Sequence, residues 1–449
     1  MYVAMVSLGC AKNLIDSEVM INILKNDKYE VIADPDLADV IIINTCGFIE
    51  KAKQESIDTI IQMGQYKEYG KCKVLIAAGC LSERYKDELL DEMPELDAVI
   101  GTGDYKSISE VIEQTLKGRK ISMHGNQEKV DIDTLDRYVS TERHTAYLKI
   151  AEGCDNRCTY CIIPSLRGKY RSRKLEEIIN EAEALASNGT KELIIIAQDT
   201  SVYGKDLYGK LMLPILLKEL AKIKGVEWIR LMYAYPDEFN DELVEVMAQE
   251  EKICRYIDIP IQHGSNKILK LMGRHTTKEK ILELISKLRK AMPDITIRTT
   301  FIVGFPGEDE ESFEELADFI KSTEFDKMGV FTYSREEDTP AYNLPYQVEE
   351  DIKQKRQDIL MSLQMDISLK KNRSYVGKTL KVLVEGFEDG RYIGRSYRDA
   401  PEIDGLVFFI NLIDSIFNLR SDFHYCFTFT LKEFMLLIFS TSISKSKFY

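Results

Sequence analysis

The chain is 449 residues long, and since a domain takes roughly 100–200 residues, it can form several domains with buried cores. Its 74 acidic and 60 basic residues give a net charge of −14, which argues against binding nucleic-acid phosphates over the whole surface and favours a basic partner. Hydrophobic residues make up 44% of the chain and charged residues 30%, a globular composition that excludes disordered and collagen-like proteins.

The first residues and the cysteines together predict a cytoplasmic protein. Residues 1–13 lack the basic and longer apolar segments of a signal peptide. No apolar run approaches the roughly 20 residues of a membrane span, so we expect no membrane partner. The nine cysteines are odd in number and widely spread, and in a reducing compartment thiols are more often metal ligands or catalysts than disulfides.

Residues 1–117 predict an α/β domain with a parallel sheet. Apolar β-rich runs alternate with stretches of helical spacing, which is typical of strands joined by crossover helices. We expect helices over Ser17–Lys25 and Glu50–Gly64. The expected strands are Tyr2–Ser7, Val40–Asn44, Lys73–Ala78 and Ala98–Gly101.

A second domain is expected over residues 145–371, after a polar connection without periodicity at residues 118–144. Six strand-like runs alternate with helical segments such as Leu175–Asn188 and Lys278–Ala291. Six β/α units form an incomplete barrel, whose ligands gather at the C-terminal ends of its strands. The runs are Ala146–Ile150, Glu192–Ala197, Trp228–Tyr233, Tyr256–Ile261, Thr296–Val303 and Met328–Tyr333.

The last part of the chain changes character twice. After a charged helix over Val348–Asn372, residues 372–409 alternate in the β manner with Gly at turns, like the start of a small antiparallel barrel. Residues 410–449 contain seven Phe but no Gly or Pro, although a small barrel needs turn residues every few positions.

Three cysteines, Cys154, Cys158 and Cys161, lie close together in EGCDNRCTYC, just after a predicted strand. Three thiolates can hold three irons of a four-iron cluster, and the missing fourth protein ligand leaves one iron open to a small molecule. The alternative is a structural zinc site, which needs a fourth ligand such as the distant Cys254 or a histidine.

This CxxxCxxC pattern, with Tyr160 before its last cysteine, resembles that of the radical S-adenosylmethionine superfamily, and an incomplete barrel fits the same resemblance. The resemblance implies that S-adenosylmethionine binds the open iron through its amino and carboxylate groups. It also implies that one electron, from an electron donor, cleaves this molecule to a 5′-deoxyadenosyl radical that takes hydrogen from an unactivated carbon.

A second set of cysteines, Cys10, Cys46 and Cys80, follows three predicted strands in VSLGC, IIINTC and LIAAGC. Each interval matches one β/α unit, so the three thiols should meet at one edge of the sheet, where parallel sheets hold ligands. The alternative is three ordinary buried cysteines. Their equivalent positions favour a second site.

Two such sites in this order resemble the methylthiotransferase family from Met1 to about Phe409. The segments SLGCAKNLIDSE, NTCGFIEKAKQESI and RTTFIVGFPGE resemble the branch that modifies ribosomal protein S-twelve. The resemblance implies a transferase that replaces a hydrogen on the β-carbon of a substrate aspartate with a methylthio group. It implies two 4Fe–4S clusters: the Cys154 cluster makes the radical, and the Cys10 cluster carries a sulfide or methylthio ligand.

Four further residues are weaker candidates for binding S-adenosylmethionine. Gln198 and Asp199 end the second barrel strand and Gln262 ends the fourth, where superfamily members place such groups. Gly304, in IVGFPGE, would let the backbone approach the adenine side of the ligand, although an ordinary turn glycine explains it equally well.

A run of five cations follows the Cys154 set. It could orient an acidic side chain or the ligand carboxylate through charge-assisted hydrogen bonds, or it could form a solvated basic face or an RNA contact. The run comprises Arg167, Lys169, Arg171, Arg173 and Lys174. We interpret Cys72, Cys254 and Cys426 as ordinary cysteines and His263 as a residue that structures its turn.

The substrate has to be chosen between a ribosomal protein and tRNA. Residues 372–409 carry six basic and six acidic side chains, whereas a barrel that grips RNA should be basic. The resemblance around Cys10 and Cys46 implies ribosomal protein S-twelve as the substrate, with a tRNA adenosine as the alternative, and the charge balance agrees with that choice. A non-catalytic iron–sulfur electron carrier is an alternative of another class, but its clusters would have four cysteine ligands each.

The family normally ends in a small β-barrel called a TRAM domain, and GRYIGRSYRDAPEIDGLVFF resembles its opening. From about Ile410 the resemblance stops. We hypothesise that a frameshift or similar error replaced the rest of this barrel with an unrelated Phe-rich tail, which would leave an exposed strand edge.

Overall fold

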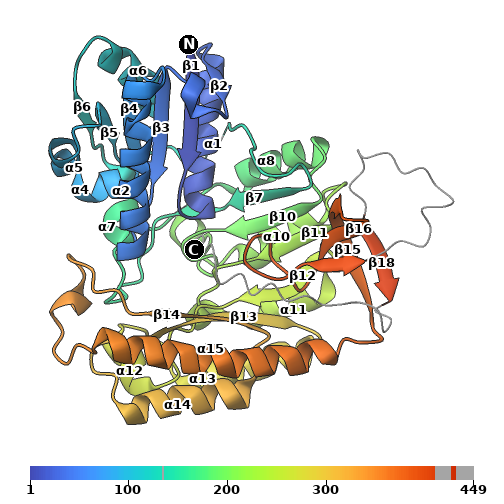
Figure 1. The fold of residues 1–449 in the computed structure, drawn as a ribbon. Coiled ribbons are helices and arrows are strands. Elements are labelled where there is room, and N and C mark those ends of the chain that lie inside the picture. Colours follow the sequence, from blue (N-terminus) through green and yellow to red (C-terminus); the bar gives the residue numbers. More distant parts are fainter. Residues whose placement is uncertain (134–135, 410–425, 431–449) are drawn as a thin grey trace.

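The N-terminal part of the chain folds as a parallel sheet with helices on both faces. The computed structural model describes residues 1–133, 136–409 and 426–430, arranged as in Figure 1. The strands lie in the order β2-β1-β3-β4-β5-β6, and neighbouring strands pair in parallel. They are β1 (Tyr2–Ser7), β2 (Glu30–Ile32), β3 (Val40–Thr45), β4 (Val74–Gly79), β5 (Ala98–Ile100) and β6 (Ile121–Met123).

Alternate residues of the central strands point to opposite faces of this sheet. Val40 and Ile42 of β3 pack with α1 and α6, whereas Ile41 and Ile43 pack with α2, α4 and α5. Both faces are covered, so β3 and β4 are buried along their whole length. The helices are α1 (Ala11–Asn26), α2 (Glu50–Gly64), α3 (Tyr66–Tyr69), α4 (Cys80–Tyr85), α5 (Asp87–Glu92) and α6 (Ile108–Leu116).

The sequence does not predict β2 and β6, because three residues are too few to show a hydrophobic period. β6 pairs with β5 and lies within residues 118–144, so the sheet extends into the stretch whose composition indicates a connection. One consequence is that this stretch is part of the N-terminal sheet as well as a link to the barrel.

The central part is an open barrel of six parallel strands, which confirms the predicted architecture. Neighbouring strands follow the chain order from β7 to β14, as expected for successive β/α units. The strands are β7 (Thr145–Lys149), β10 (Glu192–Ile196), β11 (Trp228–Leu231), β12 (Ile253–Asp258), β13 (Thr296–Val303) and β14 (Lys327–Thr332). The main helices are α8 (Leu175–Ser187), α10 (Leu213–Ala221), α11 (Asp241–Gln249), α13 (Lys278–Ala291), α14 (Glu310–Thr323) and α15 (Glu350–Arg373).

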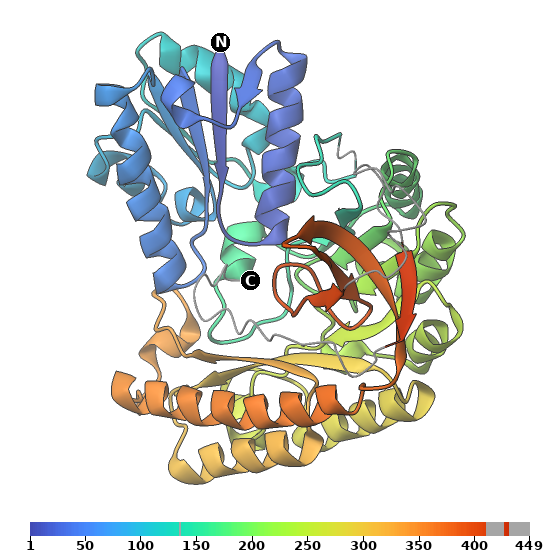
Figure 2. The ribbon, with the colours of Figure 1, turned by 45° about the vertical axis from the view of Figure 1, so that its right-hand side comes forward.

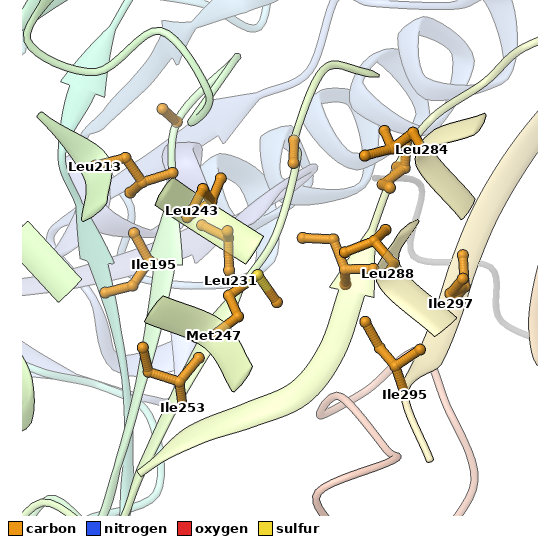
Figure 3. Packing of buried hydrophobic residues seen from close by; sticks show 14 of the residues in the cluster. Ile195, Leu213, Leu231, Leu243, Met247, Ile253, Leu284, Leu288, Ile295 and Ile297 are labelled. Atoms are coloured by element: carbon orange, nitrogen blue, oxygen red, sulfur yellow. The ribbon is translucent and has the colours of Figure 1, made fainter. Parts of the chain in front are cut away.

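The largest core lies between the outer face of the barrel strands and these helices. In Figure 3, Leu231 of β11 lies beside Leu243 and Met247 of α11, and Ile297 of β13 belongs to the same cluster as Leu288 of α13. Each fully buried Leu, Ile or Met contributes about 1.5–3 kcal/mol of hydrophobic stabilisation. This core makes the barrel a rigid support for the loops at its strand ends.

Several short elements connect the larger ones. They include five 3₁₀ turns, at Pro35–Leu37, Tyr105–Ser107, Gln127–Lys129, Pro236–Glu238 and Pro340–Asn343. The others are α7 (Ile163–Arg167), the antiparallel pair β8 (Ala151–Glu152) and β9 (Arg171–Ser172), α9 (Lys205–Tyr208) and α12 (Asn266–Leu271).

The C-terminal part is a small antiparallel sheet with the strand order β17-β16-β15-β18. The strands are β15 (Thr379–Glu388), β16 (Arg391–Ser396), β17 (Val407–Phe409) and β18 (Cys426–Thr430). β18 comes from the Phe-rich tail, whereas the rest of that tail, residues 410–425 and 431–449, lies outside the described residues. The frameshift hypothesis therefore stays a prediction.

The N-terminal domain and the small sheet contact opposite ends of the barrel strands. Lys149, the last residue of β7, pairs with Asp16 of α1 at 2.9 Å. Glu192, the first residue of β10, pairs with Arg395 of β16 at 2.6 Å. Figure 2 shows the N-terminal domain above the barrel strands and the small sheet, in red, beside them. The N-terminal domain therefore covers the strand ends at which parallel barrels hold ligands.

Among the helices described, none combines the length and apolar character needed to cross a membrane.

Candidate functional site

The first cysteine set lies at the C-terminal edge of the N-terminal sheet. Cys10 directly precedes α1, Cys46 follows β3 and Cys80 begins α4. Gly9 has a φ of +79°, and a Cβ built on it would lie 3.2 Å from Cys46 Sγ, so the turn before Cys10 faces Cys46 directly. Burial raises the pKa of the Cys46 thiol, and the thiols of Cys80 and Cys10 raise it further. The three thiols therefore act on one another electrostatically.

Cys80 has two polar neighbours. Its Sγ accepts a hydrogen bond from Arg167 Nη2 at 3.4 Å and donates one to Asn13 Oδ1 at 3.6 Å. Burial raises the pKa of the Cys80 thiol, whereas the guanidinium of Arg167 opposes this rise. Arg167 would therefore stabilise Cys80 as a thiolate, the form in which cysteine binds metal.

The second cysteine set lies on the loop after β8. The N–H of Cys154 donates to the carbonyl of Gly168 at 3.2 Å, and the N–H of Thr159 donates to the carbonyl of Met272 at 2.9 Å. Gly153 has a φ of +81°, and a Cβ there would lie 2.0 Å from the carbonyl oxygen of Lys169. Only glycine fits at this position, so the loop conformation depends on it.

The thiols of this loop are also buried against one another. Burial raises the pKa of Cys154 to about 12. Burial also raises the pKa of Cys161, and the thiol of Cys158 raises it further. Nη1 of Arg274 lies 3.8 Å from Cys158 Sγ. Iron binding would therefore release protons from these thiols, and Arg274 would offset part of the resulting negative charge.

Each set offers three thiols, which fits a four-iron cluster with one open iron. Within residues 1–133, 136–409 and 426–430, no three His, Cys, Asp or Glu side chains converge as the ligands of a single metal ion do. Cys254, considered above as a fourth zinc ligand, packs with Trp228 and Tyr256 at the barrel interior.

Two of the weaker candidates carry buried polar atoms that lack a partner among the described residues. Gln198 donates through Nε2 to Glu152 at 2.6 Å, and its Oε1 has no hydrogen-bond partner. Gln262 Oε1 is likewise buried without a partner, and its backbone has a φ of +78°. Such orphaned acceptors are costly unless a ligand supplies a donor, so both residues fit a binding role for the amino group of S-adenosylmethionine.

Asp199, Tyr160 and Gly304 have other surroundings. Asp199 accepts a hydrogen bond from Asn156 Nδ2 at 2.8 Å, and therefore holds the cysteine loop. Tyr160 packs edge to face against Phe305 at 6.4 Å between ring centres. A Cβ on Gly304 would lie 2.1 Å from Cγ of Lys353, so the lysine stem and a φ of +72° already explain this glycine.

The five-cation run does not form one basic face. Arg167 and Arg173 are buried: Arg167 pairs with Asp16 at 2.5 Å and Arg173 with Glu181 at 2.6 Å. Lys174 is exposed and pairs with Asp133, while Arg171 donates to the carbonyl of Lys169. The interpretations as a solvated face or an RNA contact are therefore wrong for the two buried arginines, which orient acidic side chains instead.

His263 and Cys72 are both buried and make local hydrogen bonds. His263 is buried, accepts the N–H of Ser265 on Nδ1 at 2.9 Å and lies 3.1 Å from Glu308, which matches its assignment to the turn. Cys72 Sγ donates to the carbonyl of Val74 at 3.3 Å. Neither residue contacts the two cysteine sets through these bonds.

Sequence reasoning missed a buried ion network at the interface between the first two domains. Lys149 pairs with Asp16 at 2.9 Å and with Glu152 at 2.8 Å, and Arg167 joins the same two carboxylates. Asp16 belongs to the motif SLGCAKNLIDSE and is a buried residue of α1. A charged residue on the buried side of a helix could have indicated this network in the sequence. The network links α1 to the loop that carries the second cysteine set.

Lys12 was also missed. It is buried in the first turn of α1, and its Nζ lies 3.1 Å from the centre of the Tyr233 ring, just after β11. Burial lowers the pKa of Lys12 to about 8, although the thiol of Cys10 raises it in part. An ammonium group therefore lies between the Cys10 set and the end of the barrel.

Three stretches of the chain match known family models. Residues 2–101 match the Uncharacterized protein family UPF0004, residues 148–320 the Radical SAM superfamily and residues 376–415 the TRAM domain. The TRAM match ends at residue 415, slightly beyond the point near Ile410 where the resemblance is expected to stop. A radical SAM domain implies a 4Fe–4S cluster and S-adenosylmethionine as cofactors.

Two solved structures resemble this chain in fold alone. TsrM from Kitasatospora setae, a radical S-adenosylmethionine methyltransferase, has a TM-score of 0.57 at 15% identity, covering 74% of this chain and 72% of that one. The cobalamin-dependent radical enzyme OxsB has a TM-score of 0.52 at 15% identity, covering 87% of this chain and 63% of its own.

Two relatives of similar length are more than 50% identical to this chain over the aligned residues. A protein of Thermoanaerobacter sp. (strain X514), named ribosomal protein uS12 methylthiotransferase RimO, is 57% identical over 406 residues, 90% of this chain and 93% of the relative. A protein of the same name from Clostridioides difficile (strain 630) is 53% identical, over 92% of this chain and 93% of the relative. The chain therefore belongs to the ribosomal protein uS12 methylthiotransferase family of radical S-adenosylmethionine enzymes.

Proposed function

We propose that this enzyme replaces a hydrogen on the β-carbon of an aspartate in ribosomal protein uS12 with a methylthio group. The observation that carries the proposal is the short path between the two cysteine sets. α7 begins two residues after Cys161, and its last residue, Arg167, contacts Cys80 Sγ at 3.4 Å. This contact brings both cysteine sets to the same interface. A sulfur donor and a radical centre have to lie at a common site for the sulfur to reach a carbon radical.

Each cysteine set holds one 4Fe–4S cluster in this proposal. Cys154, Cys158 and Cys161 hold the cluster that binds S-adenosylmethionine, and Cys10, Cys46 and Cys80 hold the cluster with the sulfide or methylthio ligand. When bound, these groups and an electron donor supply the 5′-deoxyadenosyl radical and the sulfur. Three thiolates per cluster leave one open iron each, which suits both tasks.

The side chains around the second set would hold S-adenosylmethionine. Gln198 and Gln262 would accept hydrogen bonds on the buried Oε1 atoms that lack partners among the described residues. Asp199 would act through Asn156, by fixing the cysteine loop, and Tyr160 would pack beside the loop. Gly304 would let the backbone approach the adenine side of the ligand, in addition to leaving room for the stem of Lys353.

The domain interface would exclude water from the reacting carbon. Ile162 and Leu166, next to the second set, pack with Cys80 and Phe48 of the N-terminal domain. The buried pair Lys149 and Asp16 joins the same two parts. An apolar and ion-paired contact of this kind protects a carbon radical from side reactions with solvent.

The test is anaerobic reconstitution with iron and sulfide, followed by S-adenosylmethionine, reductant and a peptide with the uS12 loop, read by mass spectrometry. We expect about eight irons per chain and the mass gain of a methylthio group on the aspartate. A chain that modifies tRNA and leaves the peptide unchanged would contradict the proposal. Binding of only about four irons would contradict the two-cluster assignment.

A variant with Cys10, Cys46 and Cys80 all changed to Ala separates the two clusters. It should keep about four irons and release 5′-deoxyadenosine, but it should leave the peptide unmodified. The matched control is Cys72→Ala, since Cys72 is buried in the same domain and its Sγ donates to the carbonyl of Val74. This control should retain all the iron.

A further inference from the structure

Lys12 occupies an unusual place for a lysine. It lies in the first turn of the 16-residue helix α1, two residues after Cys10, and is only 7% exposed. Its Nζ lies 3.1 Å from the centre of the Tyr233 ring, which belongs to the barrel. The N-terminus of a helix carries a partial positive charge, so a buried cation there is doubly unfavourable.

No carboxylate of the described residues lies within ion-pair distance of Lys12 to offset this cost. The acidic groups that act on it most are Asp258 and Glu152. Each is already bound to another cation: Asp258 to Arg298 at 2.7 Å and Glu152 to Lys149 at 2.8 Å. The ring of Tyr233 supplies only a cation–π contact, which leaves the donors of the ammonium group available for a ligand.

Tyr233 is held in place by its backbone. Its φ is +57°, a strained value for a bulky residue. Its N–H donates to Asp258 Oδ2 at 3.3 Å, and its carbonyl accepts the N–H of Thr200 at 3.0 Å. Strain of this kind persists only where the surroundings impose it, so the ring has a fixed position under the ammonium group of Lys12.

We propose that Lys12 binds the side-chain carboxylate of the substrate aspartate and selects aspartate over asparagine. This inference rests on the proposed function, since it concerns the substrate of the same site. The carboxylate is one bond away from the β-carbon that reacts, and Lys12 stands two residues from Cys10. Holding the carboxylate on Lys12 therefore places the β-carbon next to the sulfur carried by the Cys10 set.

The experiment measures binding of two peptides that carry the uS12 loop, one with Asp and one with Asn at the modified position. Reconstituted enzyme is kept anaerobic with S-adenosylmethionine but without reductant, and affinity is read by fluorescence anisotropy. A charge-assisted hydrogen bond should make the Asp peptide bind roughly 10- to 100-fold more tightly than the Asn peptide. Lys12→Met should reduce this ratio to about one, mainly by weakening the Asp peptide, and Lys12→Arg should retain most of it.

Iron content and thermal midpoint show whether each variant is folded and loaded, and Lys12→Gln replaces Lys12→Met if the latter loses iron. An unchanged Asp preference in these neutral variants would overturn the proposal. Weaker binding of S-adenosylmethionine with the Asp preference retained would also overturn it, by assigning Lys12 to the ligand carboxylate. If the unmodified enzyme binds neither peptide, both the proposed substrate and the proposed role of Lys12 are wrong. Equal binding of both peptides by that enzyme would overturn the role of Lys12 alone.

Discussion

Arg167 donates a hydrogen bond to Sγ of Cys80 at 3.4 Å, although Arg167 follows the second cysteine set and Cys80 belongs to the first. The same guanidinium pairs with Asp16 at 2.5 Å and lies 3.7 Å from Glu152. One side chain thus joins a thiol of the N-terminal domain to carboxylates of both domains. A single buried side chain therefore connects the two cysteine sets.

Arg167→Met should lower the reduction potential of the cluster on the Cys10 set, because it removes a positive charge and a hydrogen-bond donor from a ligating thiolate. An EPR-monitored redox titration measures this change. In this variant the buried carboxylates lose one cationic partner, which should destabilise the interface by about 3 kcal/mol. This is the low end of the range for breaking a buried ion pair, because Lys149 still pairs with Asp16. Arg171→Met is the matched control, and a shift of equal size in it would contradict the role of Arg167.

Gly153→Ala should prevent the loop of Cys154 from forming, because the new Cβ would lie 2.0 Å from the carbonyl oxygen of Lys169. Iron analysis should show the loss of about four irons per chain. The matched control is Gly118→Ala: its φ of +83° is similar, but nothing lies within 4 Å of the new Cβ. If both variants kept or lost iron equally, the steric explanation would be wrong.

Gln262→Leu should weaken the binding of S-adenosylmethionine by roughly 5- to 20-fold, because it removes an acceptor that has no other partner among the described residues. Equilibrium binding to the reconstituted enzyme measures the effect. Gln364→Leu is a suitable control, since Gln364 Oε1 is also buried without such a partner but lies on α15. A similar loss in both variants would indicate a general effect on folding.

The ion pair of Glu192 predicts a loss of stability in acid. Burial opposes ionisation, but Arg395 and Arg230 more than offset it and lower the pKa of Glu192 from 4.5 to about 2. Because the folded-state pKa is the lower one, this group stabilises the fold above pH 4.5 by about 3 kcal/mol, and that contribution disappears as the pH falls from 4.5 toward 2.

Denaturant unfolding between pH 7 and pH 3 checks this prediction. Glu192→Gln should lower stability at pH 7 and flatten the pH dependence below 4.5. Glu227→Gln removes a half-exposed partner of Lys381 and should change stability by less than about 1 kcal/mol. An unaltered acid profile in Glu192→Gln would show that other carboxylates dominate the loss.

Local patterns in the sequence were sufficient to find the main strands along the chain. The strand β1 and the helices α2 and α13 have the bounds that their hydrophobic periods predict. These features depend on residues close together in the chain, and a period is visible wherever an element is long enough. β2 and β6 lack that length, and they became strands only by pairing with β1 and β5.

The sequence by itself determined the family and the sheet-and-barrel architecture, because motifs and hydrophobic periods depend on residue types along the chain. Only the tertiary structure decided which cations are buried. Arg167 and Lys174 look alike in one basic run, yet Arg167 meets Asp16 from the N-terminal domain while Lys174 stays exposed. Lys12 is likewise buried against the ring of Tyr233, a residue far along the chain. Burial and charge pairing are properties of the assembled fold, since the partners come from elements that the chain brings together only on folding.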